Sequence, residues 1–336
     1  MSLKVLILGV NGFIGCNLTK KILRDTDWEI HGMDLSAHKL TPYLAQTRLH
    51  FTLGDIIKDK KWVTQHLAKC DVVLPLVAIA NPAVYIKQPL RIFELDFEAN
   101  LEIIKQCVAL KKRVIFPSTS EVYGTSPDVE FNEETSPLMQ GPINKERWIY
   151  SCCKQLLDRV IYAYGRHQSL PYTLFRPFNW IGPEQDEVND PKASVRVVPQ
   201  FICNIIHGKD LQLVDGGAQR RCFIYIDDAI DALVKIIANE NGCADSRIFN
   251  LGNPANDASI RELAEKILAY AKTTRYRELA EKIAIVNADA NQYYGSGYQD
   301  MKMRVPCIKN AEQYLHWQPT TRLDEALQLT VEYYLR

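Results

Sequence analysis

The chain has 336 residues, of which 47% are hydrophobic, and its 40 basic side chains balance its 40 acidic ones. This length is typical of about two domains with a sizeable core. The balanced charge gives no general attraction to nucleic acid or to an anionic membrane, so we expect a small-molecule ligand instead.

The N-terminus reads as a strand, a glycine-rich turn and a helix, in that order. Residues 3–8 form a short β-rich run, and helical character follows near 13–24. The turn between them reads Gly9-Val10-Asn11-Gly12-Phe13-Ile14-Gly15. Gly9 permits a tight turn, Gly12 lets the main chain approach a pyrophosphate, and Gly15 allows close packing of helix on strand. We therefore predict a dinucleotide site here, with Phe13 and Ile14 at the phosphate end of the helix.

The second predicted strand, residues 28–33, ends at Asp34, about 20 residues beyond the turn. A carboxylate there can accept hydrogen bonds from the ribose hydroxyls of NAD, whereas the 2′-phosphate of NADP would meet a like charge. Lys39 is one cation nearby, so the expected preference for NAD is moderate. A third strand leads into Asp55 and Ile56, which suit a contact with the adenine edge.

The remaining first half alternates strands and helices. We predict strands at 5–8, 29–33, 50–53, 72–76, 114–117 and 172–176, and helices near 13–24, 57–68, 90–110 and 146–166. This alternation predicts an α/β, Rossmann-type doubly wound parallel sheet with ligands at the carboxyl ends of the strands, and a smaller C-terminal substrate-binding α/β region. We place the NAD-binding domain at 1–177, joined by segments around 222–251, and the mainly substrate-binding region at 178–336.

Tyr150 and Lys154 lie four residues apart in the helix predicted at 146–166, which places them on one face. The ammonium favours the phenolate and lowers the tyrosine pKa from about 10 towards working pH, so that the phenol can take a proton from an alcohol. Tyr298 and Lys302 have the same spacing but follow Gly295-Ser296-Gly297, a loop context. The sequence therefore favours Tyr150 as the base.

Several further properties are expected absences. The nine cysteines show no Cys-x-x-Cys pair and no histidine cluster beside them, which predicts reduced thiols without a metal site or disulfides. The first ten residues lack a cationic leader, and the longest uncharged stretch, 72–86, is short and interrupted by proline. We expect a cytoplasmic protein with no signal peptide and no membrane insertion.

Five segments resemble the extended short-chain dehydrogenase/reductases that act on nucleotide sugars. They are residues 4–15, 117–124, 147–158, 175–183 and 293–304, which together cover essentially the whole chain. The resemblance is closest to the UDP-glucuronate decarboxylases represented by the decarboxylase domain of ArnA. It implies NAD-dependent oxidation of the sugar C4 hydroxyl, loss of CO2 and release of UDP-4-keto-pentose and NADH.

The resemblance also implies roles for individual residues. Tyr150 would be the base, Lys154 its modulator and a ligand of the nicotinamide ribose, and Thr119 a hydroxyl partner of the sugar. Ser120, Glu121 and Arg304 would surround the departing carboxylate. Arg304 would bind that carboxylate or help to deliver a proton, and Glu121 would repel the carboxylate or take part in protonation. The implied substrate contacts are Arg147, Asn179, Arg196, Arg221 and Tyr298.

Three alternatives stay open. NADH could stay bound and reduce the ketone to UDP-xylose, or the chain could be another nucleotide-sugar epimerase or dehydratase. Formation of UDP-apiose ranks lower. It resembles a pathway that uses a cysteine in the loop after the fourth strand, where this chain has Ala80. A non-catalytic NAD-binding scaffold or sensor is the alternative from a different class. The resemblance further implies a homodimer formed through helices 90–110 and 146–166.

Overall fold

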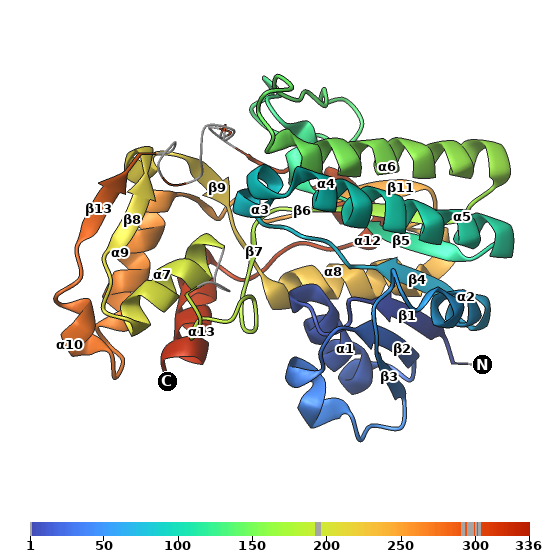
Figure 1. The fold of residues 1–336 in the computed structure, drawn as a ribbon, viewed down its shortest axis with the longest axis horizontal. Helices are drawn as coiled ribbons and strands as arrows, with labels where there is room; N and C mark the ends of the chain where they lie inside the picture. The colour runs from blue at the N-terminus through green and yellow to red at the C-terminus, as the bar shows by residue number, and fades with distance from the viewer. Residues whose placement is uncertain (1, 192–195, 290–292, 294–298, 300, 302–303) are drawn as a thin grey trace.

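The fold is built on one parallel sheet (Figure 1). The computed structural model describes residues 2–191, 196–289, 293, 299, 301 and 304–336. Seven strands lie in the order β11-β6-β5-β4-β1-β2-β3, and every pairing is parallel. Their bounds are β1 (Lys4–Leu8), β2 (Glu29–Asp34), β3 (Leu49–Leu53), β4 (Val72–Pro75), β5 (Arg113–Pro117), β6 (Tyr172–Pro177) and β11 (Arg247–Leu251). The predicted doubly wound sheet is confirmed.

Alternating side chains of β1 explain why both faces of the sheet are covered. Val5 and Ile7 point into one apolar cluster, while Leu6 and Leu8 point into another. The first cluster includes α1 (Phe13–Asp25) and α8 (Ile226–Ala238). The second includes α2 (Lys60–Lys69), α5 (Asn100–Leu110) and α6 (Trp148–Gln168). A strand buried on both faces reads as a continuous apolar run, as 5–8 does.

The helix predicted at 90–110 is divided. Its region consists of α3 (Pro82–Lys87), α4 (Pro89–Ile92), a π-helical segment at Phe93–Ala99 and then α5. Prolines at the first positions of α3 and α4 start those helices separately. In the π-helical segment, Asp96 is fully buried and accepts a hydrogen bond from the main-chain N–H of Ile79 at 3.1 Å.

The helix predicted at 57–68 begins later, because residues before it form a hydrogen-bonded turn. Asp55 Oδ1 accepts from the N–H of Ile57 at 2.9 Å, and Asp59 Oδ2 accepts from the N–H of Asp55 at 2.7 Å. The helix α2 therefore starts at Lys60.

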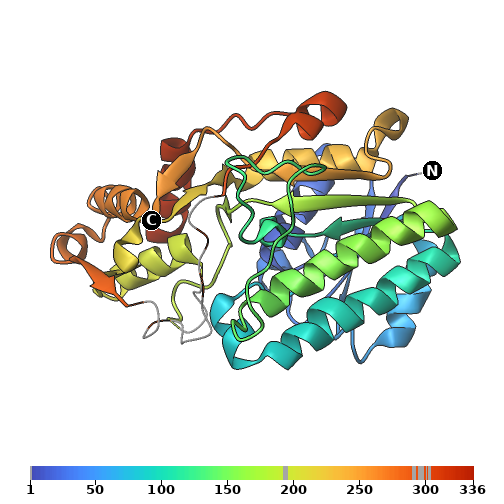
Figure 2. The same cartoon turned by 90° about the horizontal axis from the view of Figure 1, so that it is seen from above.

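The region after residue 178 forms a second, smaller body at one end of the sheet (Figures 1 and 2). It contains three two-stranded sheets, which pair β7 with β10, β8 with β13 and β9 with β12. Their bounds are β7 (Trp180–Ile181), β8 (Leu211–Val214), β9 (Arg220–Cys222), β10 (Ile224–Tyr225), β12 (Asp257–Ser259) and β13 (Ile285–Ala288). The accompanying helices are α7 (Val197–Ile206), α9 (Ile260–Ala271), α10 (Arg277–Ala280) and α13 (Leu323–Leu335), whereas α12 (Lys309–Leu315) packs against β11 and α8 of the main body.

The chain crosses between the two bodies more than once. After β10, it returns to the main sheet through α8 and β11, which pairs with β6. The division at residue 177 stays a prediction. Across the part of the chain that the structure describes, no helix is both long enough and apolar enough to cross a bilayer.

Candidate active site

The glycine turn between β1 and α1 has the shape that a dinucleotide requires. Gly9 has φ +88°, and its N–H donates to the carbonyl of Met33 at 2.8 Å. A Cβ on Gly15 would lie 2.4 Å from the carbonyl oxygen of Gly9, so a side chain there would collide with the main chain. The N-terminus of α1 is therefore held against the turn, with Gly12 as the residue before its first turn. These observations fit a pyrophosphate at this helix end.

Asp34 is placed where the sequence predicted it, at the end of β2 and beside the glycine turn. Its Oδ2 accepts from the main-chain N–H of Asn11 at 2.9 Å. Asn11 is buried, and its own Oδ1 accepts from the N–H of Lys39 at 2.9 Å. The carboxylate is thus oriented by the turn itself, in a position suited to ribose hydroxyls.

A cavity of about 410 Å³ opens at the carboxyl ends of the strands. Its lining brings together the glycines, Thr119, Ser120 and Glu121 after β5, Tyr150 and Lys154 on α6, and Asn179 and Arg196 from the second body. Asp34 and Asp55 lie outside this lining. A smaller cavity of about 160 Å³ shares Glu121, Asn179 and Arg304 with it and extends into the second body.

Tyr150 and Lys154 both lie on α6, as expected, and both are buried. Lys154 Nζ donates to the carbonyl of Pro117 at 3.0 Å, at the end of β5. It lies 6.0 Å from the centre of the Tyr150 ring. Tyr85 stacks on this phenol, with ring centres 4.7 Å apart and planes 6° from parallel. The phenol is thereby fixed at the inner end of the cavity.

Burial dominates the electrostatics of this pair. It raises the pKa of Tyr150 above its ordinary value, and the negative charges of Asp96 and Glu121 act in the same direction. A hydrogen bond with Thr119 opposes this shift. Burial also lowers the pKa of Lys154, which Asp96 counteracts most strongly. The sequence had predicted that Lys154 would lower the pKa of Tyr150, but in the structure burial raises it.

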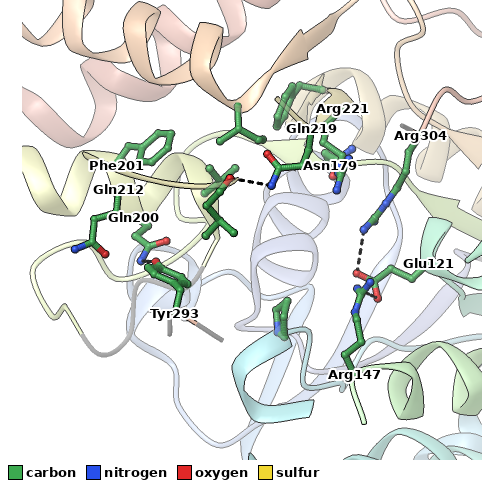
Figure 3. A pocket seen from close by; sticks show the side chains of 15 residues that line it. Glu121, Arg147, Asn179, Gln200, Phe201, Gln212, Gln219, Arg221, Tyr293 and Arg304 are labelled. Carbon is green, nitrogen blue, oxygen red and sulfur yellow. Dashed lines mark hydrogen bonds and ion pairs between the residues drawn. The ribbon is translucent and has the colours of Figure 1, made fainter. Parts of the chain in front are cut away.

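Glu121 lies between two buried arginines, as Figure 3 shows. Its Oε2 is 2.9 Å from Nη2 of Arg147, and its Oε1 is 3.5 Å from Nη2 of Arg304. Arg147 also donates to the main-chain carbonyl of Gln299 at 2.9 Å. Three charged groups with a net positive charge therefore line the smaller cavity, and two of them, Glu121 and Arg304, also line the larger one.

The other predicted substrate residues are distributed around the same walls. Asn179 lines both cavities and donates to the carbonyl of Cys222 at 3.0 Å. Arg221 lines the smaller cavity, and Arg196 lines the larger one while forming an ion pair with Asp186. Tyr298 lies outside the described residues.

Two residues of this site were missed by the sequence analysis. Asp96, in the π-helical segment, has one buried carboxylate oxygen without a hydrogen-bond partner, and burial raises its pKa to about 6. Tyr85 forms the stacking surface for Tyr150. Residues 92–97 contain two acidic side chains, Glu94 and Asp96, and nothing in their spacing predicts that Asp96 is the buried one.

A model of the NAD dependent epimerase/dehydratase family matches residues 5–252. The chain belongs to this family. NAD is therefore the cofactor, and the glycine turn, Asp34, Tyr150 and Lys154 are the residues that would hold it.

Solved structures agree with this assignment. The chain is 51% identical to the PbgP3 protein from Burkholderia pseudomallei, covering 100% of this chain and 97% of that one, with a TM-score of 0.91. UDP-glucuronic acid 4-epimerase from Bacillus cereus, solved with UDP-glucuronic acid and NAD, is 22% identical over 99% of each chain, with a TM-score of 0.81. dTDP-glucose 4,6-dehydratase from Bacillus anthracis, in complex with NAD, is 20% identical, with a TM-score of 0.79, covering 99% of this chain and 96% of that one.

Proposed function

We propose that this protein oxidises UDP-glucuronate at C4 with NAD and decarboxylates the product to UDP-4-keto-pentose, releasing CO2 and NADH. The observation that carries this proposal is the group formed by Glu121, Arg147 and Arg304 in the cavity wall. Two guanidinium groups on one wall provide the charge and the forked donors that suit a carboxylate. A neutral hexose has no carboxylate that could bind these guanidinium groups.

The first step removes the proton of the C4 hydroxyl group and the hydride of C4 itself. Tyr150, as phenolate, takes the hydroxyl proton, and Thr119 donates a hydrogen bond to the sugar near the reacting carbon. Bound NAD would supply the acceptor for the C4 hydride, and its positive nicotinamide would oppose the burial that raises the pKa of Tyr150. Lys154 would hold the nicotinamide ribose.

The second step breaks the bond between C5 and the carboxyl carbon. The new C4 carbonyl is β to the carboxylate, so the electron pair of the breaking bond passes into that carbonyl as CO2 leaves. The resulting enolate then takes a proton at C5. We assign Arg304 to binding the carboxylate, because its contact with Glu121 is the longer of the two. Arg147 holds Glu121 in place. The negative charge of Glu121 would repel the substrate carboxylate, and Glu121 would take part in the protonation at C5.

Arg221 and Asn179 are proposed contacts of the nucleotide diphosphate in the smaller cavity, and Arg196 of the glucuronyl end in the larger one. We propose the same class of contact for Tyr298 and a contact with the leaving carboxylate for Ser120. A structural relative that was solved with UDP-glucuronic acid and NAD supports the choice of a nucleotide-linked uronic acid, since the fold accommodates both molecules.

The test is to incubate the purified protein with NAD and UDP-glucuronate and to measure NADH, CO2 and the mass of the nucleotide sugar. The proposal expects NADH and CO2 in equal amounts and a keto-pentose product. A six-carbon product with an inverted C4 would establish a 4-epimerase instead, which is the second candidate because of the UDP-glucuronic acid 4-epimerase likeness. CO2 without net NADH would indicate UDP-xylose, and NAD binding without turnover would indicate a scaffold.

We also propose that the protein is a homodimer and cytoplasmic. Leu156 and Tyr162 on α6 and Leu110 at the end of α5 are large apolar side chains that are more than one third exposed. Their position on neighbouring helices favours a shared apolar interface. Sedimentation equilibrium, compared with a Leu156→Glu/Tyr162→Glu double variant, tests this. A monomer for both proteins would contradict the proposed dimer.

A further inference from the structure

A second cluster of chemically distinctive side chains lies away from both cavities. Glu29 and His31 are on β2, two residues apart, so they point to the same face of the sheet. His50 on β3 is the register partner of His31. None of the three lines either cavity. They lie near the amino ends of their strands, whereas the cofactor cavity opens at the carboxyl ends.

The imidazole rings of His31 and His50 both approach one carboxylate oxygen of Glu29. Glu29 Oε1 is 2.7 Å from Nε2 of His31 and 3.2 Å from Nε2 of His50. One ligand atom from each of the three residues lies within 4.8 Å of the other two. The two imidazole rings stack with centres 4.7 Å apart. Parallel strand pairing therefore brings two imidazole nitrogens and one carboxylate oxygen to one point.

We propose that Glu29, His31 and His50 form a binding site for a divalent transition-metal cation, with zinc as the first candidate. Imidazole nitrogens and a carboxylate oxygen are ligands that zinc uses, with metal–ligand distances of about 2.0–2.2 Å. A tetrahedral site then needs ligand atoms roughly 3.3–3.5 Å apart. The separation between Glu29 and His50 is close to this value, and that between Glu29 and His31 needs to open by about half an ångström. Water would complete the coordination.

Neighbouring groups bear on this site in two ways. Lys4 Nζ lies 3.1 Å from Oε2 of Glu29 and donates to Oε1 at 3.3 Å, so it holds the carboxylate while its positive charge weakens cation binding. Its side chain is 44% exposed and can turn towards solvent. His66 packs 5.4 Å from His31, and its Nδ1 contacts the carbonyl of Trp62, which keeps that ring in place behind the site.

The site would connect the edge of the sheet to its interior. β3 is the last strand of the sheet and pairs only with β2 among the described strands. A metal bound by residues of both strands would hold this edge and stabilise the folded state, because the unfolded chain does not bring the three ligands together.

The test uses the full-length protein with any histidine tag removed, treated with EDTA and then freed of the chelator. Zinc binding is measured by calorimetry and by thermal unfolding. We expect one site and a rise in Tm of about 4 °C at zinc concentrations one hundred times Kd. His50→Ala should weaken binding at least about 10-fold and remove the Tm rise, while NAD binding stays unchanged. The matched control is His167→Ala, which removes an exposed histidine elsewhere.

X-ray absorption of the zinc-loaded protein identifies the ligands. Scattering from nitrogen and oxygen only, with imidazole features lost in His50→Ala, is the expected result. Sulfur ligands would overturn the proposal, because the chain has nine free thiols that also bind zinc. Equal zinc affinity in wild type and in His50→Ala would overturn it as well. Lys4→Met provides a further check, since loss of the competing charge should tighten binding.

Discussion

The two sides of the cavity around Tyr150 differ in how their charged groups are paired. On the inner side, Lys154 and Asp96 are fully buried, and each charge is compensated mainly by the other and by main-chain groups. On the outer side, Glu121 is held by two arginines in a wall that also borders the smaller cavity. Asp96 on the inner side and Glu121 on the outer side both raise the pKa of the phenol, and under the proposed function the outer side would also select the charge of the substrate.

The largest expected effect comes from removing the phenolic oxygen. Tyr150→Phe should lower the rate of NADH formation from UDP-glucuronate by about 100-fold or more, because no other group takes the C4 proton. NAD binding should persist, since the ring still stacks on Tyr85. Absorbance of NADH and NAD titration measure the two properties. Tyr85→Phe is the matched control and should retain activity; near-normal turnover in Tyr150→Phe would end the base assignment.

Arg304 tests the outer side. Arg304→Ala should reduce kcat/KM for UDP-glucuronate by about 10- to 100-fold, the value of a charged hydrogen bond. Arg304→Lys should recover part of the loss, because the charge returns without the forked geometry. Steady-state kinetics of both variants, with the exposed Arg159→Ala as control, give the comparison. Equal activity of all three would remove Arg304 from the site.

Glu121→Gln tests the charge of the same side of the cavity, because glutamine can still accept a hydrogen bond from Arg147 but carries no charge. We expect tighter binding of UDP-glucuronate, owing to the lost repulsion, together with a decrease of about 10-fold in kcat if Glu121 takes part in protonating C5. A rapid-quench comparison of NADH formation with CO2 release separates the steps. Unchanged kcat with tighter binding would leave repulsion as its whole role.

The smallest effect is expected on the inner side, from Asp96→Asn. The negative charge of Asp96 raises the pKa of Tyr150, so its removal should shift the acidic limb of the kcat/KM profile to lower pH. Glutamine or leucine at this position would disturb packing, but asparagine can still accept from Ile79. A profile that superimposes on wild type would show that Asp96 does not influence the phenol.

The same substitution has a consequence for stability. Burial raises the pKa of Asp96 from its ordinary value to about 6, so the carboxyl favours folding below pH 4 and this contribution is lost as the pH rises through 6. Asp96→Asn should therefore raise Tm by a few degrees at pH 8 and by less at pH 4. Scanning calorimetry at both pH values measures the difference, and a gain independent of pH would contradict the assigned ionisation.

Parts of the site were predictable because they depend on short spacings. The glycines of the first turn, Asp34 at the end of the next strand, and the helical pair Tyr150 and Lys154 follow from local geometry. The contacts of Glu121 were not predictable in this way, since Arg147 and Arg304 lie 26 and 183 positions further along the chain. The divided helix was missed although Pro82 and Pro89 start separate helices, and the burial of Asp96 follows only from the packing around it.

Glu29, His31 and His50 also come together only through the pairing of two strands. The sequence predicted no metal site, because its cysteines form no Cys-x-x-Cys pair and no histidine cluster lies beside them. His31 and His50 are 19 positions apart in the sequence and meet only because β2 and β3 pair in one particular register. A pairing shifted by one residue would turn His50 to the opposite face.

The sequence by itself determined the alternation of strands and helices up to β6, the dinucleotide turn and the presence of a tyrosine and a lysine on one helix face, because each depends on neighbouring residues. Only the tertiary structure decided which charges meet at the cavity wall and in which direction the pKa of Tyr150 moves. Desolvation and long-range pairing set these properties, and both depend on all the atoms that surround a group, however distant in the chain.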